Sequence, residues 1–143
     1  MYLLLAFFAG ACISIQASMN AIIGTSLKSS MYSTTIAFSV SSLICAITLL
    51  IFRSEIPAAE SFKSIPIFYW FSGAFSAIGV GLFYLLIPKI GVDKMMSWAL
   101  TGQLIIAVVI AHYGWFNAQV SIFNSDKALG IVLMGIGIAM INR

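Results

Sequence analysis

Five apolar spans dominate the sequence, and none of them contains an Asp, Glu, Lys or Arg residue. An α-helix needs about 20 apolar residues to cross roughly 30 Å of hydrocarbon, and four of the spans are long enough. The fifth span is shorter, but Ser125 can cap it and Asp126 suits a first helical turn. In lipid, backbone polar groups must be paired within the segment, so each span predicts a helix and not a strand. The predicted helices cover approximately residues 2–24, 34–52, 67–87, 95–113 and 128–142.

The composition supports a membrane location for the whole chain. Of its 143 residues, 62% are apolar and only 8% are charged, whereas soluble domains are about one quarter charged. The first span has no Lys or Arg before it and is followed by four more spans, so we interpret it as a retained helix and not as a signal peptide. The sequence therefore predicts one all-α membrane domain, residues 1–143, with five transmembrane helices and with its termini on opposite sides.

The loops do not predict an orientation. A surface loop is expected from Arg53 to Pro66, and a tight polar turn from Pro88 to Lys94. Cytoplasmic loops usually hold more Lys and Arg than external loops, but with five spans each side carries four positive charges. Either the chain has one orientation with a weak signal, or it inserts both ways and inverted copies pair around a midplane site, as in transporters built from inverted repeats. The charges are the terminal amine, Arg53, Lys63 and Lys127 on one side, and Lys28, Lys89, Lys94 and Arg143 on the other.

Two amide side chains lie inside the first span. Gln16 and Asn20 are four residues apart, so they share one face of a helix with Gly24. An amide that faces lipid would leave its donors and acceptors unpaired, at a cost of several kcal/mol on the harsher transfer scales. The pair must therefore face protein or water. It either joins helices, at about 0.6–2 kcal/mol per bond, or lines a neutral hydrogen-bonding cavity, and its position beside Gly24 favours the cavity.

The third span has small residues at a spacing of four, which lets helix backbones approach closely. They are Gly73, Ala77 and Gly81. Tyr69 and Tyr84 lie near that face and near the ends of the span, where aromatic residues are typical of the membrane interface. We expect the glycines to pack against another helix and the tyrosines to act as interfacial anchors.

The fourth and fifth spans add further candidates. Trp98 is either an interfacial residue, which its place near the span start favours, or an aromatic wall for a ligand, and His112 is expected at the opposite interface. Thr101 lies near Trp98, whereas Gln103 faces elsewhere. The predicted substrate-binding residues are Gln16, Asn20, Trp98, Thr101 and Gln103. The predicted packing or dimer residues are Gly73, Ala77, Gly81, Gly130, Gly135 and Ala139.

Several functions have no support in the sequence. No span carries a carboxylate that could couple transport to protons or sodium, and there is no Ser/His/Asp set for a hydrolase. The sequence also lacks a zinc motif and a phosphate-binding glycine-rich loop, so we expect no enzyme activity, cofactor or metal. Cys12 and Cys45 are interpreted as isolated thiols in apolar helices. No basic cluster alternates with aromatic residues, so a nucleic-acid partner is not expected.

Four motifs in order carry a family resemblance that extends over nearly the whole chain. They are Ile-Gln-Ala-x-x-Asn-Ala at Ile15–Ala21 between Gly10 and Gly24, Trp70-x-x-Gly73 followed by Pro88-x-x-Gly91, Gly102-Gln103-Leu104 with Gly114, and Gly130 with Gly135. With this span count, the chain resembles the five-helix YdcZ-like branch of the drug/metabolite transporter superfamily, which is related to the EamA proteins. It departs from the related small multidrug exporters, which use a first-helix glutamate for proton coupling where this chain has Gln16 and Asn20.

The resemblance implies a multi-pass protein of the bacterial inner membrane that pairs in inverted orientation, giving ten helices. The partner would be a second copy or a separate homologous chain. Together with the residues, it predicts a transporter, most simply an exporter of a polar or amphipathic small molecule, that works by alternating access. The alternative is a membrane scaffold, or an accessory subunit of a heteromeric transporter, in which the amides only join helices.

Overall fold

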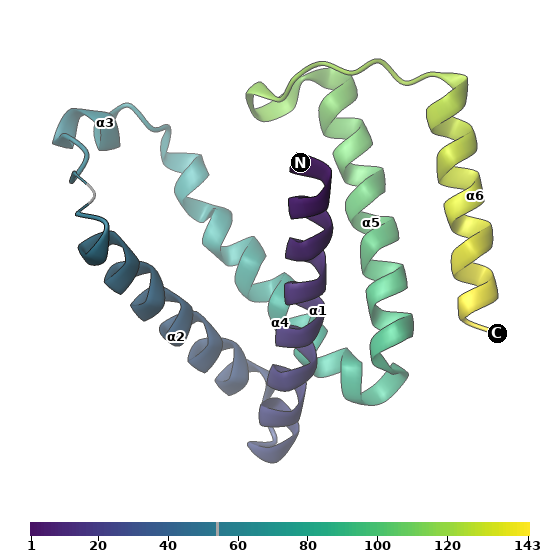
Figure 1. Ribbon diagram of the computed structural model, residues 1–143, viewed down its shortest axis with the longest axis horizontal. Coiled ribbons are helices and arrows are strands. Elements are labelled where there is room, and N and C mark those ends of the chain that lie inside the picture. Colours follow the sequence, from purple (N-terminus) through teal and green to yellow (C-terminus); the bar gives the residue numbers. More distant parts are fainter. Residues whose placement is uncertain (54) are drawn as a thin grey trace. The chain divides into compact units, whose positions relative to one another are not determined.

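The computed structural model describes residues 1–53 and 55–143, and within these residues the regular elements are all helices (Figure 1). Ser54, which belongs to the loop expected from Arg53 to Pro66, lies outside the described residues. The chain divides into two compact units, Met1–Lys89 and Ile90–Arg143. The all-α class predicted from the apolar spans is therefore confirmed for the part of the chain described.

In the first unit, α1 (Tyr2–Ser26) and α2 (Ser30–Ile51) form a helical hairpin with a short turn (Figure 1). The second helix begins four residues earlier than expected. Its N-cap is Ser29, whose side chain accepts a hydrogen bond from the backbone N–H of Tyr32 at 3.3 Å. Because this cap satisfies one of the free N–H groups of the first turn, the polar residues after it can join the helix.

The first unit continues with α3 (Ala59–Lys63), the 3-10 helix η1 (Ile67–Phe71) and all but the last residue of α4 (Ser72–Ile90). The loop expected from Arg53 to Pro66 therefore contains one short helix. The helix expected to end at residue 87 continues through Pro88. Proline lacks the N–H that would bond to the carbonyl of Tyr84, but the lost bond falls in the last turn, where a helix is interrupted at little cost.

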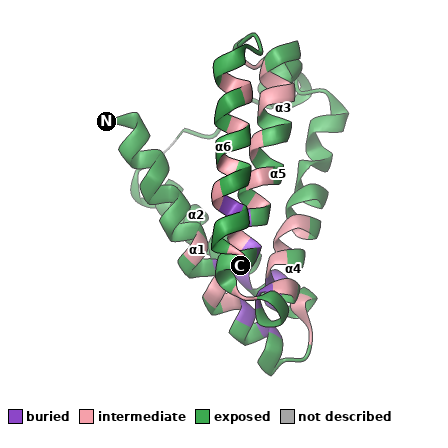
Figure 2. Ribbon diagram, turned by 90° about the vertical axis from the view of Figure 1, so that its right-hand side faces the viewer, coloured by how far each residue is buried: buried purple, intermediate pink, exposed green. Residues whose placement is uncertain are grey.

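The buried residues of the first unit gather where α1, α2 and α4 meet (Figure 2). Most are small, so the three backbones can approach closely. The rest of the apolar surface of these helices is exposed in the single chain. The buried residues are Ala17, Ala21, Gly24, Ser33, Thr34, Ala37, Gly81, Tyr84 and Ile87.

In the second unit, α5 (Val92–Tyr113) and α6 (Ser125–Ile141) lie side by side (Figures 1 and 2). Between them, after the short 3-10 helix η2 (Trp115–Asn117), the chain returns across the end of α5, and Ser121 N–H donates to the carbonyl of Ala111 at 2.9 Å. The first helix of the unit is followed by Gly114, which has the left-handed φ of 64° common after a helix C-terminus. The second is capped by Asn124, which accepts from Lys127 N–H at 3.0 Å, so the predicted cap at Ser125 is one residue too late.

The expected tight turn from Pro88 to Lys94 is much shorter in the structure, because helices extend into it from both sides. Only Gly91 separates α4 from α5, and its φ is 92°. A Cβ atom at this position would lie 2.7 Å from Oδ1 of Asp93. Gly91 is therefore suited to the turn both by its backbone conformation and by the space around it.

Four helices in the described part of the chain are long and apolar enough to cross a membrane. They are Tyr2–Ser26, Ser30–Ile51, Ile67–Ile90 and Val92–Tyr113. At 17 residues, α6 is shorter than the roughly 20 residues that a straight crossing takes. The fifth crossing, and with it the placement of the termini on opposite sides, stays a prediction.

Candidate functional site

Gln16 on α1 makes a side-chain hydrogen bond to another helix. Its Nε2 donates to the hydroxyl oxygen of Tyr84 on α4 at 2.6 Å, across 68 positions of sequence. The Tyr84 side chain is only 1% exposed. The expectation that Tyr84 anchors the protein at the membrane interface is therefore wrong: the residue lies on the predicted face of its helix, but that face is turned into the bundle.

Asn20 lies one turn further along α1 and links this helix to α2. Its side-chain Nδ2 donates to the backbone carbonyl of Gln16 at 2.9 Å, and its own backbone carbonyl accepts from Ser33 Oγ at 2.6 Å. Ser33 is fully buried, and the adjacent Thr34 is 3% exposed. These five residues, from three helices, form what we call the polar cluster: Gln16, Asn20, Ser33, Thr34 and Tyr84.

Several other hydroxyl groups in the long helices donate within their own helix. Ser14, Ser18 and Thr25 on α1 each donate to the carbonyl four residues earlier, at 2.8 to 3.2 Å. This back-bonding hides the hydroxyl from lipid without a partner helix. The longer amide of Gln16 has more polar atoms than one such bond satisfies, so it needs a partner on another helix.

The polar cluster retains unused hydrogen-bond acceptors. No described residue donates to the side-chain carbonyl oxygen of Gln16 or of Asn20. The five members of the cluster are all uncharged. The arrangement can therefore accept hydrogen bonds from the N–H or O–H groups of a neutral or weakly polar molecule, and it offers no carboxylate for binding a proton or a cation.

One of the predicted packing residues lies at a helix contact within the chain. Gly81 is buried, and a Cβ atom there would lie 3.5 Å from Met31 Sδ and from Thr34 Oγ1, both on α2. In contrast, Gly73, Gly130 and Gly135 have open space around them. Ala77 is half-buried and Ala139 is exposed. A role for these other residues in packing against a second chain stays a prediction.

The remaining predicted binding residues lie on α5, in the second unit. Trp98 is 63% exposed and Gln103 is also exposed, while Thr101 Oγ1 donates to the carbonyl of Ser97 at 2.9 Å. The sequence reasoning missed Asn142, the residue that follows the last turn of α6. Its Nδ2 donates to Ser97 Oγ at 3.0 Å, and its buried Oδ1 has no partner in the structure described. A polar residue at the end of an apolar span was its only signal.

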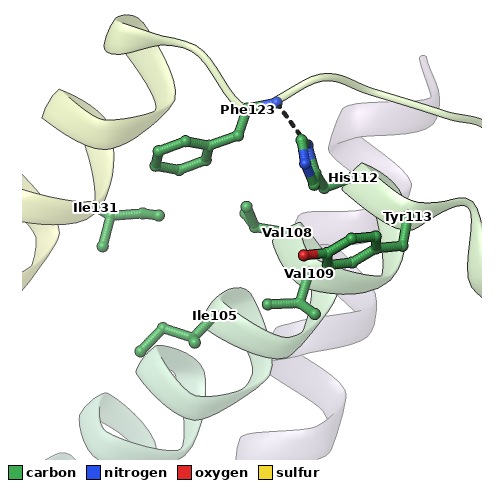
Figure 3. A pocket seen from close by; sticks show the side chains of 7 residues that line it. All are labelled: Ile105, Val108, Val109, His112, Tyr113, Phe123 and Ile131. Carbon is green, nitrogen blue, oxygen red and sulfur yellow. Dashed lines mark hydrogen bonds between the residues drawn. The ribbon is translucent and has the colours of Figure 1, made fainter.

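A hollow lies between α5, the returning loop and α6 (Figure 3). It has a volume of about 400 Å³ and an almost entirely aliphatic and aromatic lining. His112 stands at its edge and accepts a hydrogen bond at Nδ1 from the backbone N–H of Phe123, at 3.2 Å. In a neutral imidazole this bond places the proton on Nε2. The histidine thus holds the loop to the end of its helix.

Metal binding finds no support in the geometry. Among the residues that the structure describes, no group of three or more His, Cys, Asp or Glu side chains could hold a metal ion. Cys12 and Cys45 are both free and exposed in the single chain.

Helices of bilayer length, two of which join neutral polar groups to each other, indicate an α-helical membrane protein. Comparison with family models identifies its family: residues 1–140 match the family described as "Putative inner membrane exporter, YdcZ", and the chain belongs to this family. The resemblance inferred from the four sequence motifs is confirmed. No curated protein and no solved structure gives a match.

Proposed function

We propose that the protein exports a small polar or amphipathic molecule across the bacterial inner membrane, and that the polar cluster forms part of its substrate site. One observation carries the proposal: on a helix of bilayer length, Gln16 donates to Tyr84 of α4 and Asn20 donates within α1, and the side-chain carbonyl oxygens of both amides accept no hydrogen bond from any described residue. The family description supports export. Transporter sites commonly lie within the membrane, between helices.

We also propose that the working unit is an inverted dimer that alternates between two open states. Within the single chain, at most 17% of the most apolar stretch of any crossing helix is buried. Much apolar helix surface is thus left for lipid and for a partner. The glycines with open space, Gly73, Gly130 and Gly135, would allow a second copy to approach closely. The balanced loop charges favour insertion in both directions.

A scaffold or accessory subunit is the second candidate. It is favoured by the fact that each amide already has one hydrogen bond within the chain, from Gln16 to Tyr84 and from Asn20 to its own helix. In that role the polar cluster would be dry and tightly packed, and its side chains would contribute only to stability.

Transport assays separate these two functions. The purified chain is reconstituted in liposomes and tested with a panel of metabolites and drugs, alongside Gln16→Ala, Asn20→Ala and a control, Ser14→Ala, whose hydroxyl bonds only within its own helix. The proposal is supported if a panel member is exported and its export rate falls at least about tenfold in the amide variants, while the control keeps its rate. A tenfold fall corresponds to a loss of roughly 1.4 kcal/mol. Absence of transport, with amide variants that change only thermal stability, supports the scaffold.

A further inference from the structure

A groove opens at one end of the first unit, where α1 ends, α2 begins and α4 ends. It has a volume of about 290 Å³ and is separate from the hollow beside His112. Lys28 lines it from the turn between α1 and α2, and Lys89 lines it from the last turn of α4. Two cationic side chains from distant parts of the sequence thus share one small opening.

Neither lysine is neutralised by a residue that the structure describes. No described residue forms an ion pair or a hydrogen bond with either ammonium group, and no carboxylate lines the groove. Lys127 in the second unit is different, because its Nζ donates to the carbonyls of Ser121 and Ile122 and to the Ser121 hydroxyl, at 2.6 to 2.9 Å. The positive charge of the groove is therefore available to a ligand.

The backbone around Lys28 is held in place. Lys28 N–H donates to the carbonyl of Thr25 at 3.1 Å, and Ser29 N–H donates to the carbonyl of Gly24 at 2.9 Å. Lys28 itself has a φ of 53°, a conformation that L-residues seldom adopt. The turn also presents the N-terminus of α2, whose helix dipole favours negative charge.

The lining of the groove suits a head group with a less polar body. Thr25 and Ser29 also line the groove and carry hydroxyl groups, while Tyr84, Leu85 and Pro88 give its lining a less polar part. We propose that the groove binds an anionic group, a phosphate or a carboxylate, carried either by a solute or by a lipid. Two ammonium groups can both contact such an anion, which makes stronger hydrogen bonds than a neutral group.

The proposal is tested by binding and does not depend on transport. The full chain is purified into nanodiscs of zwitterionic lipid, and its affinity for inorganic phosphate, a short monoalkyl phosphate and a short alkyl carboxylate is measured by calorimetry. A second arm counts the phosphatidylglycerol molecules retained after purification from mixed lipid. Binding in the first arm identifies a solute, and retention in the second identifies a lipid; either result supports the site.

The variants Lys28→Gln and Lys89→Gln test whether the groove is responsible. Loss of one cation is expected to weaken binding, or reduce lipid retention, roughly tenfold. The matched control is Lys63→Gln on α3, which lies outside the groove. Lys28→Arg keeps the charge and should retain most of the binding, and thermal unfolding without ligand checks that all variants fold. No binding in either arm, or an equal loss in the Lys63 variant, overturns the proposal.

Discussion

Gln16 shows what a single residue can and cannot reveal. Its amide has too many polar atoms to face lipid, so the sequence predicts that it is turned toward protein or water, and the structure places it against Tyr84. The identity of the partner could not be predicted, because Tyr84 is 68 positions away and one sequence does not show which helix faces come together. The position of Tyr84 near a span end also fitted an interfacial residue equally well.

Tyr84→Phe tests the bond between α1 and α4. The substitution keeps the buried ring but removes the oxygen that accepts from Gln16, so the free energy of unfolding in mild detergent should fall by about 0.6–2 kcal/mol. In a double-mutant cycle with Gln16→Ala the two losses should be strongly non-additive. Tyr2→Phe, at a side chain that is 81% exposed, is the control. Additive losses would show that the two side chains do not interact.

At the scale of the elements, the apolar spans predicted the order of the four helices of bilayer length but not their ends, and a fifth crossing stays a prediction. The second helix begins at Ser30 and not near residue 34, because the Ser29 cap admits polar residues to its first turn. The third predicted helix, α4 in the structure, continues past Pro88, where the sequence predicted the start of a turn. Capping bonds and a tolerated proline depend on local geometry that hydropathy does not register.

Gly81→Leu tests the contact between α4 and α2. A Cβ atom alone would sit at ordinary contact distance from Met31 and Thr34, but a leucine side chain would push the helices apart. We expect a loss of about 1–3 kcal/mol in the free energy of unfolding. At Gly73 of the same helix, where space is open, the same substitution should leave the fold intact. If both variants unfold alike, the close contact at Gly81 is not as described.

Gly91→Ala tests the turn between α4 and α5. Its φ of 92° and the 2.7 Å approach of Asp93 Oδ1 to an added Cβ atom disfavour any side chain. The expected loss of stability is about 1–2 kcal/mol, measured by thermal unfolding of the purified chain. Gly79→Ala is the control, because it lies inside a helix with open space around it, and it should be neutral or slightly stabilising. A neutral Gly91 variant would contradict the strained turn.

At the scale of the whole molecule, the membrane class and the family followed from the sequence, because spans without charge and four ordered motifs are visible in one chain. The orientation and the dimer could not follow in the same way. The loop charges balance, and an interface with a second copy leaves no hydrogen bond or burial within one chain. The open faces at Gly130 and Gly135 indicate only where a partner could approach.

Dual insertion is tested by labelling from each side of the membrane. In a chain with Cys12 and Cys45 replaced by alanine, a single cysteine is placed at Lys28 or at Lys63, and inside-out and right-side-out vesicles are treated with an impermeant thiol reagent. If the chain inserts both ways, each site should react in part from each side. Labelling of each site from one side only would rule out dual insertion and with it the inverted homodimer.

The central claim is that the amides of α1 line a solvated cavity, and thiol accessibility tests it most directly. In the same cysteine-free chain, Gln16→Cys and Asn20→Cys are compared in native membranes with two controls, Ile15→Cys and Met19→Cys. The control positions neighbour the amides on other faces of the helix, and Ile15 and Met19 are each 62% exposed in the single chain. A small water-soluble thiol reagent should modify the first pair much faster, because thiols react as thiolates in water and not in lipid. Equal protection of all four positions would contradict a solvated cavity.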